Sequence, residues 1–217
     1  RELGAIDQEY AKNVENDDIR AYYVLKELGN PEHPNHSFGM GNRAALSGVS
    51  QATLKQWYHD HYSANRMRLE VISPLPLGKL KEIVVDAFKD VPNKNLPAIA
   101  IPAPLFTDAL RDKMIYIEPI KQLRQLTLLW ELPERFGAMR ETKPELIICH
   151  ILGNEGKSSL IDELKNDKLA EGVQCGTQHI GGKSYGLFLQ IDLTDAGVKD
   201  INKVILRCFE AIANMKD

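Results

Sequence analysis

The strongest constraint on how this chain can fold is a cluster of prolines near its middle. The stretch from residue 90 to residue 112 contains Pro92, Pro97, Pro102 and Pro104. Proline fixes φ and has no backbone N–H, so neither a helix nor a central strand tolerates prolines at this density. The stretch therefore predicts a linker or a domain crossing. We place the boundary near Leu105, which divides the chain into residues 1–105 and residues 106–217.

The first part is predicted to be mainly helical. Apolar spacing indicates a helix from Glu2 to about Leu28 that breaks near Asn16. Ser50 is a plausible N-cap for a helix that ends near His61. Residues 67–73 alternate between apolar and polar side chains, as a strand does, and a second amphipathic helix is predicted over residues 77–89.

The second part reads as strands interleaved with helices. Strands are predicted at residues 113–119, 125–132, 170–179 and 184–193, and Gly181-Gly182 is compatible with a hairpin between the last two. Helices are predicted from Pro144, from Ser158 or Ser159, and from Asp195 to about Met215. This order predicts an α+β fold in which helices pack on a mostly antiparallel sheet.

Composition excludes some partners. The 217 residues carry a formal net charge of −3 and a pI near 6.1, and nucleic-acid binding would favour a basic patch instead. No apolar run approaches the roughly 18 to 20 residues that cross a bilayer. We therefore expect neither a nucleic-acid partner nor a membrane partner.

The three cysteines are Cys149, Cys175 and Cys208, an odd number at wide spacing. We interpret them as buried free thiols in a reducing compartment, which suggests a cytoplasmic location. The paired ligands of a zinc knuckle are missing. A cysteine nucleophile at Cys149 beside His150 is an alternative, although consecutive residues on a helix point in different directions.

Two carboxylates mark the first helix. Glu2 and Glu9 are seven residues apart, close to two full turns, so they share one face. Leu3, Ala5 and Ile6 would lay the helix on a core while the carboxylates face a cleft. Such a pair could bind a metal or orient its ligands, and the alternative is an ordinary solvated surface.

The residues around this pair resemble the insulin-degrading enzyme and pitrilysin family of zinc metallopeptidases. The resemblance rests on the run E-x-x-A-I-D-x-E-x-x-K-N from Glu2 to Asn13, on residues 30–34 and on residues 38–42. Members of the family take two zinc ligands and a catalytic glutamate from an H-x-x-E-H helix. By resemblance, Glu9 is the third zinc ligand and Glu2 is an acidic residue that supports the catalytic site.

No H-x-x-E-H occurs in this sequence. We therefore interpret the chain as an internal fragment, with residues 1–105 ending the zinc-bearing domain and residues 106–217 beginning a second, homologous αβ domain. The histidines outside such a motif are interpreted as structural residues. His33 and His36 are expected in a surface loop pinned by proline and glycine, and His59 and His61 are expected to pack or cap. One carboxylate falls short of the three protein ligands of a catalytic zinc, so the fragment alone is expected to be inactive and to hold zinc weakly or not at all.

The resemblance also implies an exosite that captures the N-terminus of a peptide substrate. Its loop residues would be His150, Gly153 and Glu155, and its strand residues would be Val173, Cys175 and Thr177. A carboxylate suits a free α-amino group, and an exposed strand edge can pair with an extended peptide. This chain has Asn154 where the family often has histidine, and Cys175 where the family has glycine.

The resemblance implies a full-length zinc metalloendopeptidase that degrades short peptides in a closed chamber, where zinc-activated water attacks the peptide bond. Its partners would be peptide substrates and the remaining domains of the same polypeptide, and a homo-oligomer is left open. Two alternatives are a non-catalytic structural or regulatory member of the family and an unrelated αβ binding module.

Overall fold

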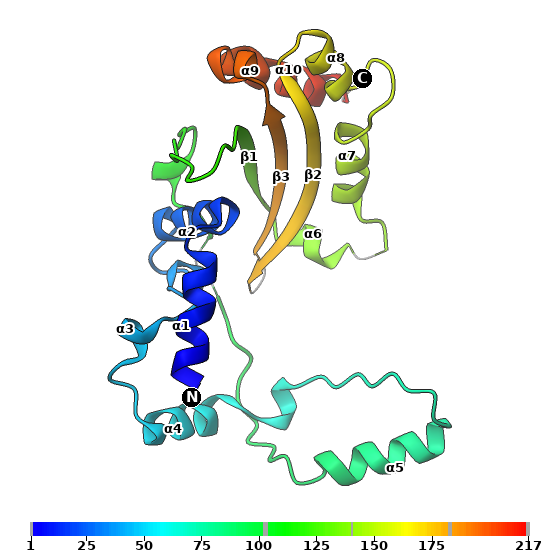
Figure 1. Ribbon diagram of the computed structural model, residues 1–217. Coiled ribbons are helices and arrows are strands. Elements are labelled where there is room, and N and C mark those ends of the chain that lie inside the picture. The colour runs from blue at the N-terminus through cyan, green and yellow to red at the C-terminus, as the bar shows by residue number, and fades with distance from the viewer. Residues whose placement is uncertain (1, 102–103, 140, 182–183, 216–217) are drawn as a thin grey trace.

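The computed structural model describes residues 2–101, 104–139, 141–181 and 184–215 (Figure 1). Up to residue 101 the described elements are helical. The α-helices are α1 (Glu2–Asn13), α2 (Asp17–Leu28), α3 (Arg43–Leu46), α4 (Gln51–His61) and α5 (Leu77–Phe88). Short 3-10 helices lie at Pro34–His36 (η1) and Ala64–Arg66 (η2). The predicted break in the first helix and the predicted α4 and α5 are confirmed.

Side-chain caps explain why these helices begin where they do. The Asn16 side chain accepts hydrogen bonds from the backbone N–H groups of Asp18 (3.0 Å) and Ile19 (3.2 Å), so α2 starts afresh after α1. Ser50 Oγ likewise accepts from the N–H of Thr53 at 3.1 Å and caps α4. These local bonds need no distant partner, and sequence alone could therefore predict them.

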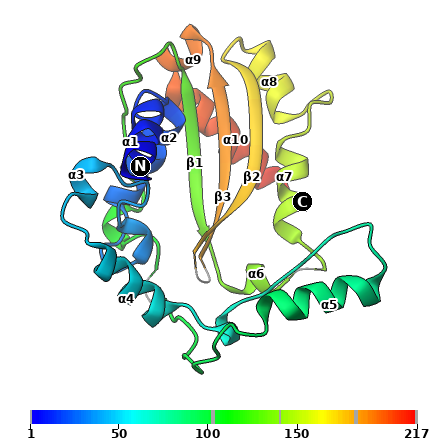
Figure 2. The same ribbon diagram turned by 60° about the horizontal axis from the view of Figure 1, so that its bottom comes forward.

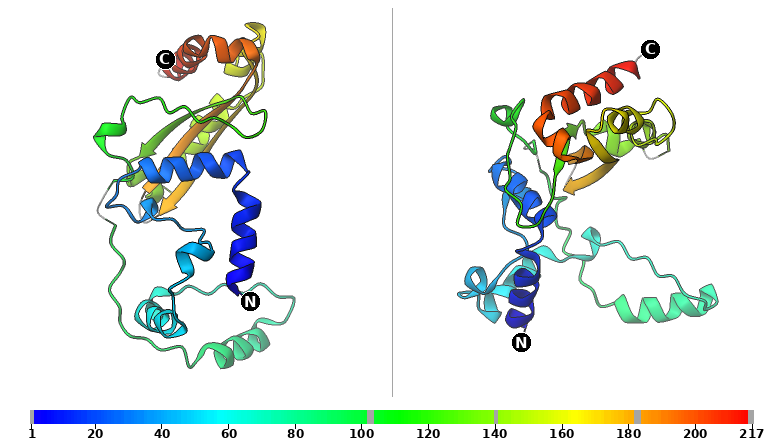
Figure 3. Two further views of the ribbon diagram at one scale, coloured as in Figure 1. Left: turned by 60° about the vertical axis from the view of Figure 1, so that its left-hand side comes forward. Right: turned by 45° about the horizontal axis from the view of Figure 1, so that its top comes forward.

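The apolar faces of the first part are not buried within the described residues. Leu3 on α1 is 43% exposed and Leu77 on α5 is 80% exposed. The expectation that Leu3, Ala5 and Ile6 lay α1 on a core is wrong for this chain, since Ala5 is also exposed and only Ile6 is partly covered. Figure 3 shows α5 standing away from the other helices, with no sheet beneath it.

Residues 67–73 run as an extended segment before α5 (Figure 1) but form no strand, contrary to the prediction. Residues 113–119 behave in the same way. A strand becomes part of a sheet only when a neighbour receives its backbone hydrogen bonds, and the described residues supply none beside either segment. The alternating pattern therefore reports the extended conformation correctly but not the pairing.

The second part contains an antiparallel sheet. Its strands are β1 (Gln125–Leu132), β2 (Ala170–Gly181) and β3 (Ser184–Leu193), in the order β1-β3-β2. Leu189 in β3 lies opposite both Leu128 in β1 and Cys175 in β2. All three strands were predicted. The second residue of the predicted Gly181-Gly182 turn lies outside the described residues.

Helices cover one face of this sheet. The helices of the second part are α6 (Arg135–Ala138), α7 (Pro144–Leu152), α8 (Leu160–Asn166), α9 (Asp195–Lys199) and α10 (Ile201–Asn214), and a 3-10 helix, η3, lies at Asp108–Leu110. In Figure 2, α10 crosses behind the sheet and α7 lies beside β2. The fully buried Leu164, Leu189 and Val204 bring α8, β3 and α10 into one core. The α+β fold class is confirmed.

The predicted last helix is in fact two helices. Asp200 has non-helical dihedral angles and separates α9 from α10. Thr194, at the start of α9, contacts the segment just before β2, because its hydroxyl donates to the carbonyl oxygen of Lys168 at 2.7 Å. The chain must therefore turn after α9 before α10 can lay Val204 and Cys208 against the core.

The two parts meet around Leu105, where the domain boundary was predicted. The backbone N–H of Leu105 donates to the Glu131 carboxylate at 2.8 Å, and its carbonyl oxygen accepts from the N–H of Asn30 at 2.9 Å. His33 is 2% exposed, and its Nε2 lies 3.4 Å from Ser184 Oγ in β3. These polar contacts connect the first part to the sheet. Within the described ranges, we find no helix with the length and hydropathy of a membrane span.

Asp17 forms a second connection between the two parts and predicts an acid-dependent change. Its carboxylate accepts from the N–H groups of Ile120 and Lys121, both at 2.9 Å, and pairs with Arg20. The two backbone hydrogen bonds, followed by Arg20, hold the pKa of Asp17 below its usual value of 3.8. The stabilisation from a lowered carboxyl pKa is complete above the unfolded value and is lost as the pH falls through the folded value.

We therefore expect Asp17→Asn to speed amide hydrogen exchange at residues 118–121, with an effect that is constant between pH 7 and pH 5. The exchange should be normalised at each pH to intrinsic rates, and the difference from wild type should shrink below about pH 4. Asp18→Asn is the matched control, because Asp18 shares the first turn of α2 and is exposed. An effect that is equal at pH 7 and pH 3 would contradict the assignment.

Candidate functional site

The α1 carboxylates share one face of the helix, as predicted. Glu2 lies in the first turn, Glu9 lies about two turns later, and both are exposed. Asp7 orients the helix, because its carboxylate accepts from the backbone N–H of Arg43 at 2.9 Å and from Arg43 Nε at 3.3 Å. These hydrogen bonds lower the pKa of Asp7. The structure thus fixes α1 against α3 and leaves the Glu2 and Glu9 face uncovered.

The described residues do not by themselves fit a catalytic zinc. They contain no group of three or more histidine, cysteine, aspartate or glutamate side chains placed to hold a metal ion. Glu9 offers one carboxylate, whereas a catalytic zinc takes three protein ligands. The remaining ligands of a catalytic zinc would have to come from residues outside the described part of this chain.

A cavity of about 530 Å³ lies between α1, α2 and the loop near Met40. Tyr10, Tyr23 and Lys26 are among its lining residues, whereas Glu2 and Glu9 are not. Lys26 is buried, and its ammonium group lies 5.4 Å from the centroid of the Tyr23 ring. Burial lowers the pKa of Lys26. We therefore assign this cavity to the packing of α2 and not to the predicted site at Glu2 and Glu9.

The histidines hold structural positions. His33 Nδ1 accepts from the backbone N–H of Asn35 at 3.0 Å, and His36 Nδ1 lies 3.1 Å from the carbonyl oxygen of Lys26. His61 stacks on Trp57, with ring centroids 4.6 Å apart. The structural interpretation of these residues agrees with the geometry. His33, however, is buried at the junction with the sheet and does not lie on a surface loop.

A second candidate site lies between α7 and β2. A cavity of about 500 Å³ opens there, and its lining includes five of the six predicted exosite residues: His150, Gly153, Glu155, Val173 and Cys175. The sixth, Thr177, is two residues beyond Cys175 on the same face of β2. Leu146 and Gln174 also line the cavity, and the sequence had not singled them out. The two sides of this cavity, within residues 146–155 and 173–175, are therefore at least 18 positions apart in sequence.

The end of α7 explains how the loop comes so close to the strand. The backbone N–H of Gly153 donates to the carbonyl oxygen of Cys149 at 2.9 Å and closes the helix. A Cβ at this position would lie 3.0 Å from that oxygen and 3.9 Å from the backbone nitrogen of Cys175. A Cβ would therefore crowd the end of α7, whereas its distance from Cys175 would be an ordinary van der Waals contact. Asn154 Oδ1 then accepts from the N–H of Gly156 at 2.7 Å and turns the loop.

The strand side of the site lies at the edge of the sheet. Val173, Cys175 and Thr177 pair with Ile191, Leu189 and Leu187, whose side chains are buried on the helix-covered face. Their side chains therefore point toward that same face. Because β2 ends the order β1-β3-β2, its outer edge has no strand partner among the described residues. An edge of this kind can accept an extended peptide.

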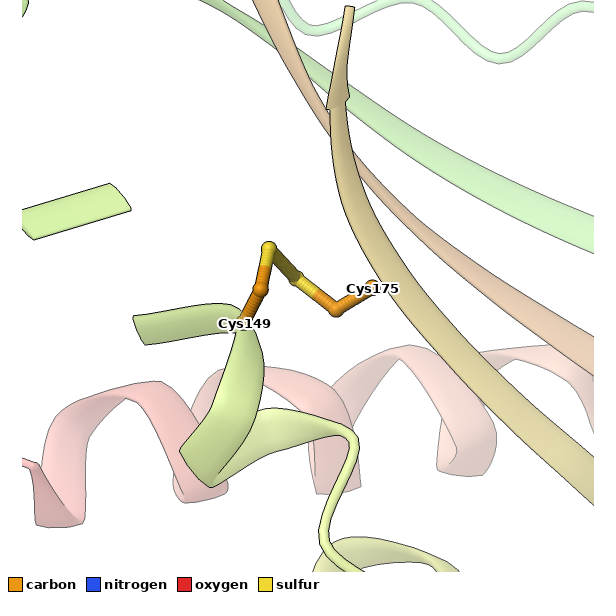
Figure 4. The surroundings of a disulfide bond; sticks show 2 residues. All are labelled: Cys149 and Cys175. Carbon is orange, nitrogen blue, oxygen red and sulfur yellow. A yellow bond between two sulfur atoms is a disulfide. The ribbon is translucent and has the colours of Figure 1, made fainter. Parts of the chain in front are cut away.

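A disulfide joins the two sides of this site. Cys149 on α7 is bonded to Cys175 on β2, with their Cα atoms 4.8 Å apart (Figure 4). The expectation that all three cysteines are free thiols is wrong for this pair, because the fold brings residues 26 apart in sequence face to face. The disulfide also excludes Cys149 as a thiolate nucleophile. Cys208 is a buried free cysteine, and burial raises the pKa of its thiol to about 11.

Comparisons with known proteins agree with this architecture. A family model described as the peptidase M16 inactive domain matches residues 48–217. Human insulin-degrading enzyme is 32% identical over 225 residues, which cover 100% of this chain and 22% of that protein. The A-factor-processing enzyme of Saccharomyces cerevisiae is 30% identical over 100% of this chain and 22% of its own length. A crystal structure of pitrilysin aligns with a TM-score of 0.90 at 29% identity, over 99% of this chain and 23% of that chain.

The fold and these matches define a domain of the peptidase M16 type. The chain belongs to the peptidase M16 family, as the resemblance in its sequence predicted, and it spans less than a quarter of the length of the relatives just named. A relative in Schizosaccharomyces pombe, 31% identical over 98% of this chain and 22% of that protein, is described as a zinc protease. The helices α1 and α2 precede the residues matched by the family model, which begin at residue 48.

Proposed function

We propose that this chain is part of a longer zinc metalloendopeptidase and provides the site that holds the N-terminus of a peptide substrate. The observation that carries the proposal is the edge of β2, which has no strand partner in the described part of the chain and lies beside a cavity of about 500 Å³ lined by Glu155. A peptide could add to the edge as a further strand and place its first residue in the cavity. The site would hold peptides by their backbone and their terminus, with little dependence on their sequence.

The charge of the cavity suits a free α-amino group. This group carries a positive charge near neutral pH, since its pKa is about 8. Glu155 supplies a negative charge, and His150 adds a second polar side chain on the α7 side. A charge-assisted hydrogen bond of this kind contributes roughly 1.5–3 kcal/mol. Recognition of the terminus would therefore change binding by about tenfold or more.

The catalytic zinc would be held jointly with residues outside this chain. We propose that Glu9 donates one carboxylate and that Glu2 supports the site from the same face of α1. When bound, the zinc would polarise the scissile carbonyl group and lower the pKa of the attacking water. This chain's own contribution is to position Glu9 through the Asp7–Arg43 contact between α1 and α3.

Hydrolysis of paired peptides by the full-length polypeptide tests the proposed exosite. We expect a peptide with a free N-terminus to be cleaved with a kcat/KM about tenfold higher than that of its N-acetylated counterpart. Glu155→Gln should reduce this ratio toward one. Glu163→Gln, on the exposed side of α8, is the matched control and should leave it unchanged. Equal cleavage of both peptides by the wild type would refute N-terminus capture.

A non-catalytic member of the family is the second candidate. It draws support from the description of the matched domain as inactive, although that match leaves out Glu2 and Glu9. Chelator-sensitive peptide hydrolysis by the full-length polypeptide would exclude it. The cytoplasmic location stays a prediction, and the disulfide favours an oxidising compartment instead.

A further inference from the structure

The α7 helix has few buried contacts that hold it in place. Of its nine residues, only Cys149 and Leu152 are buried, and Ile148 adds a partly buried contact with the core. Leu146, Ile147 and Ile151 are large apolar side chains that remain exposed. The disulfide to Cys175 is the one covalent link from the described part of α7 to the sheet. This bond therefore contributes much of the constraint that holds α7 in position against β2.

The loop that follows α7 is held mainly by local bonds. Residues 154–158 are exposed, and within the loop the backbone N–H of Gly156 donates to Asn154 and that of Ser158 donates to Asp162 on α8. These bonds shape the loop but do not tie it to β2. The distance between Glu155 and the strand edge therefore depends on where α7 ends.

We propose that the Cys149–Cys175 disulfide is a redox-sensitive tether that sets the N-terminus-binding site. This inference rests on the proposed function. With the bond intact, α7 and its loop are held opposite the β2 edge, so the peptide backbone and its amino group meet preformed partners. Opening the bond lets α7 move against β2, and binding must then order the site. The oxidised protein therefore captures free N-termini more strongly than the reduced protein.

The chemistry requires a dithiol reductant. One thiolate of the reductant attacks a sulfur of the protein disulfide and forms a mixed disulfide, and its second thiol then releases the protein. The S–S bond breaks, Cys149 and Cys175 each gain a proton, and the two electrons come from the dithiol, which becomes a cyclic disulfide. Both cysteines line the cavity, which gives a small dithiol access. Cys208, fully buried in α10, is the matched internal control.

The experiment compares free and N-acetylated peptides with the oxidised and the dithiothreitol-treated full-length polypeptide. We expect reduction to lower the free-to-acetylated ratio of kcat/KM at least about threefold. Because both peptides use the same zinc, any loss of metal to the dithiol cancels in the ratio. Cys208→Ser should respond as the wild type does, and Cys149→Ala/Cys175→Ala should show the lower ratio with and without reductant.

A second measurement does not depend on activity. Reduction should speed amide hydrogen exchange across residues 144–159 and leave β3 unchanged. An unchanged ratio and unchanged exchange, with thiol counting that shows the bond open, would overturn the inference. Thiol counting that finds no Cys149–Cys175 bond in the oxidised protein would also overturn the inference. Equal cleavage of both peptides by the oxidised protein would instead identify a failure of N-terminus capture, and the role given to the tether would fall with it.

Discussion

Replacement of Glu9 by glutamine in the full-length polypeptide is expected to abolish zinc-dependent peptide hydrolysis. Glutamine keeps the size and exposure of the side chain but removes the negative charge that a zinc ligand provides. Changes in residues that merely support a metal ligand typically cost 10–100-fold in affinity or activity. We therefore expect kcat/KM to fall by more than about 100-fold, with zinc lost on dialysis, as measured by peptide hydrolysis and metal analysis.

The comparison of Glu9 with other carboxylates makes the test specific. Glu2→Gln, on the same face of α1, should cost about 10–100-fold while most of the zinc is retained. Glu15→Gln is the matched control, since Glu15 is exposed just after α1, and it should leave both activity and zinc content unchanged. Full activity and stoichiometric zinc in the Glu9→Gln variant would show that α1 carries no metal ligand.

The substitution Gly197→Ala is expected to give the largest loss of stability in the second part of the chain. Gly197 is buried in α9, and a Cβ there would overlap the backbone carbonyl oxygen of Leu169. Backbone atoms cannot rotate away as a side chain can, so α9 must shift from the start of β2. Overpacking of this kind costs about 1–3 kcal/mol and sometimes more, and we expect at least about 3 kcal/mol.

Urea unfolding can be followed through Trp130, which packs edge-on against Phe209 of α10 with ring centroids 6.5 Å apart. A Trp57→Phe background makes Trp130 the single tryptophan of these 217 residues, which are the polypeptide to be unfolded. Gly78→Ala in α5 is the matched control, because nothing lies within 4 Å of a Cβ there. It should leave the Trp130 transition unchanged or raise stability by up to about 1 kcal/mol. An unchanged unfolding midpoint for Gly197→Ala would contradict the close packing of α9.

Features that depend on neighbouring residues could be predicted without the structure. The caps at Asn16 and Ser50 set the starts of α2 and α4 through bonds that span only a few residues. Strands were predicted at residues 125–132 and 184–193, and β1 and β3 form there because each is the other's antiparallel partner. The family resemblance came from short runs around Glu2 and Glu9, and the comparisons confirmed it.

Tertiary structure decided whatever depends on residues far apart in the chain. Residues 67–73 carry the pattern of a strand, yet they remain unpaired because pairing needs a partner that the local sequence does not supply. The wide spacing of the cysteines suggested free thiols, and only the packing of α7 beside β2 placed Cys149 against Cys175. His33 was likewise expected in a surface loop, but it is buried at the contact with Ser184 of β3. Local sequence fixes caps and periodicity through short-range bonds, whereas the Cys149–Cys175 and His33–Ser184 contacts arise only when the folded sheet brings distant segments together.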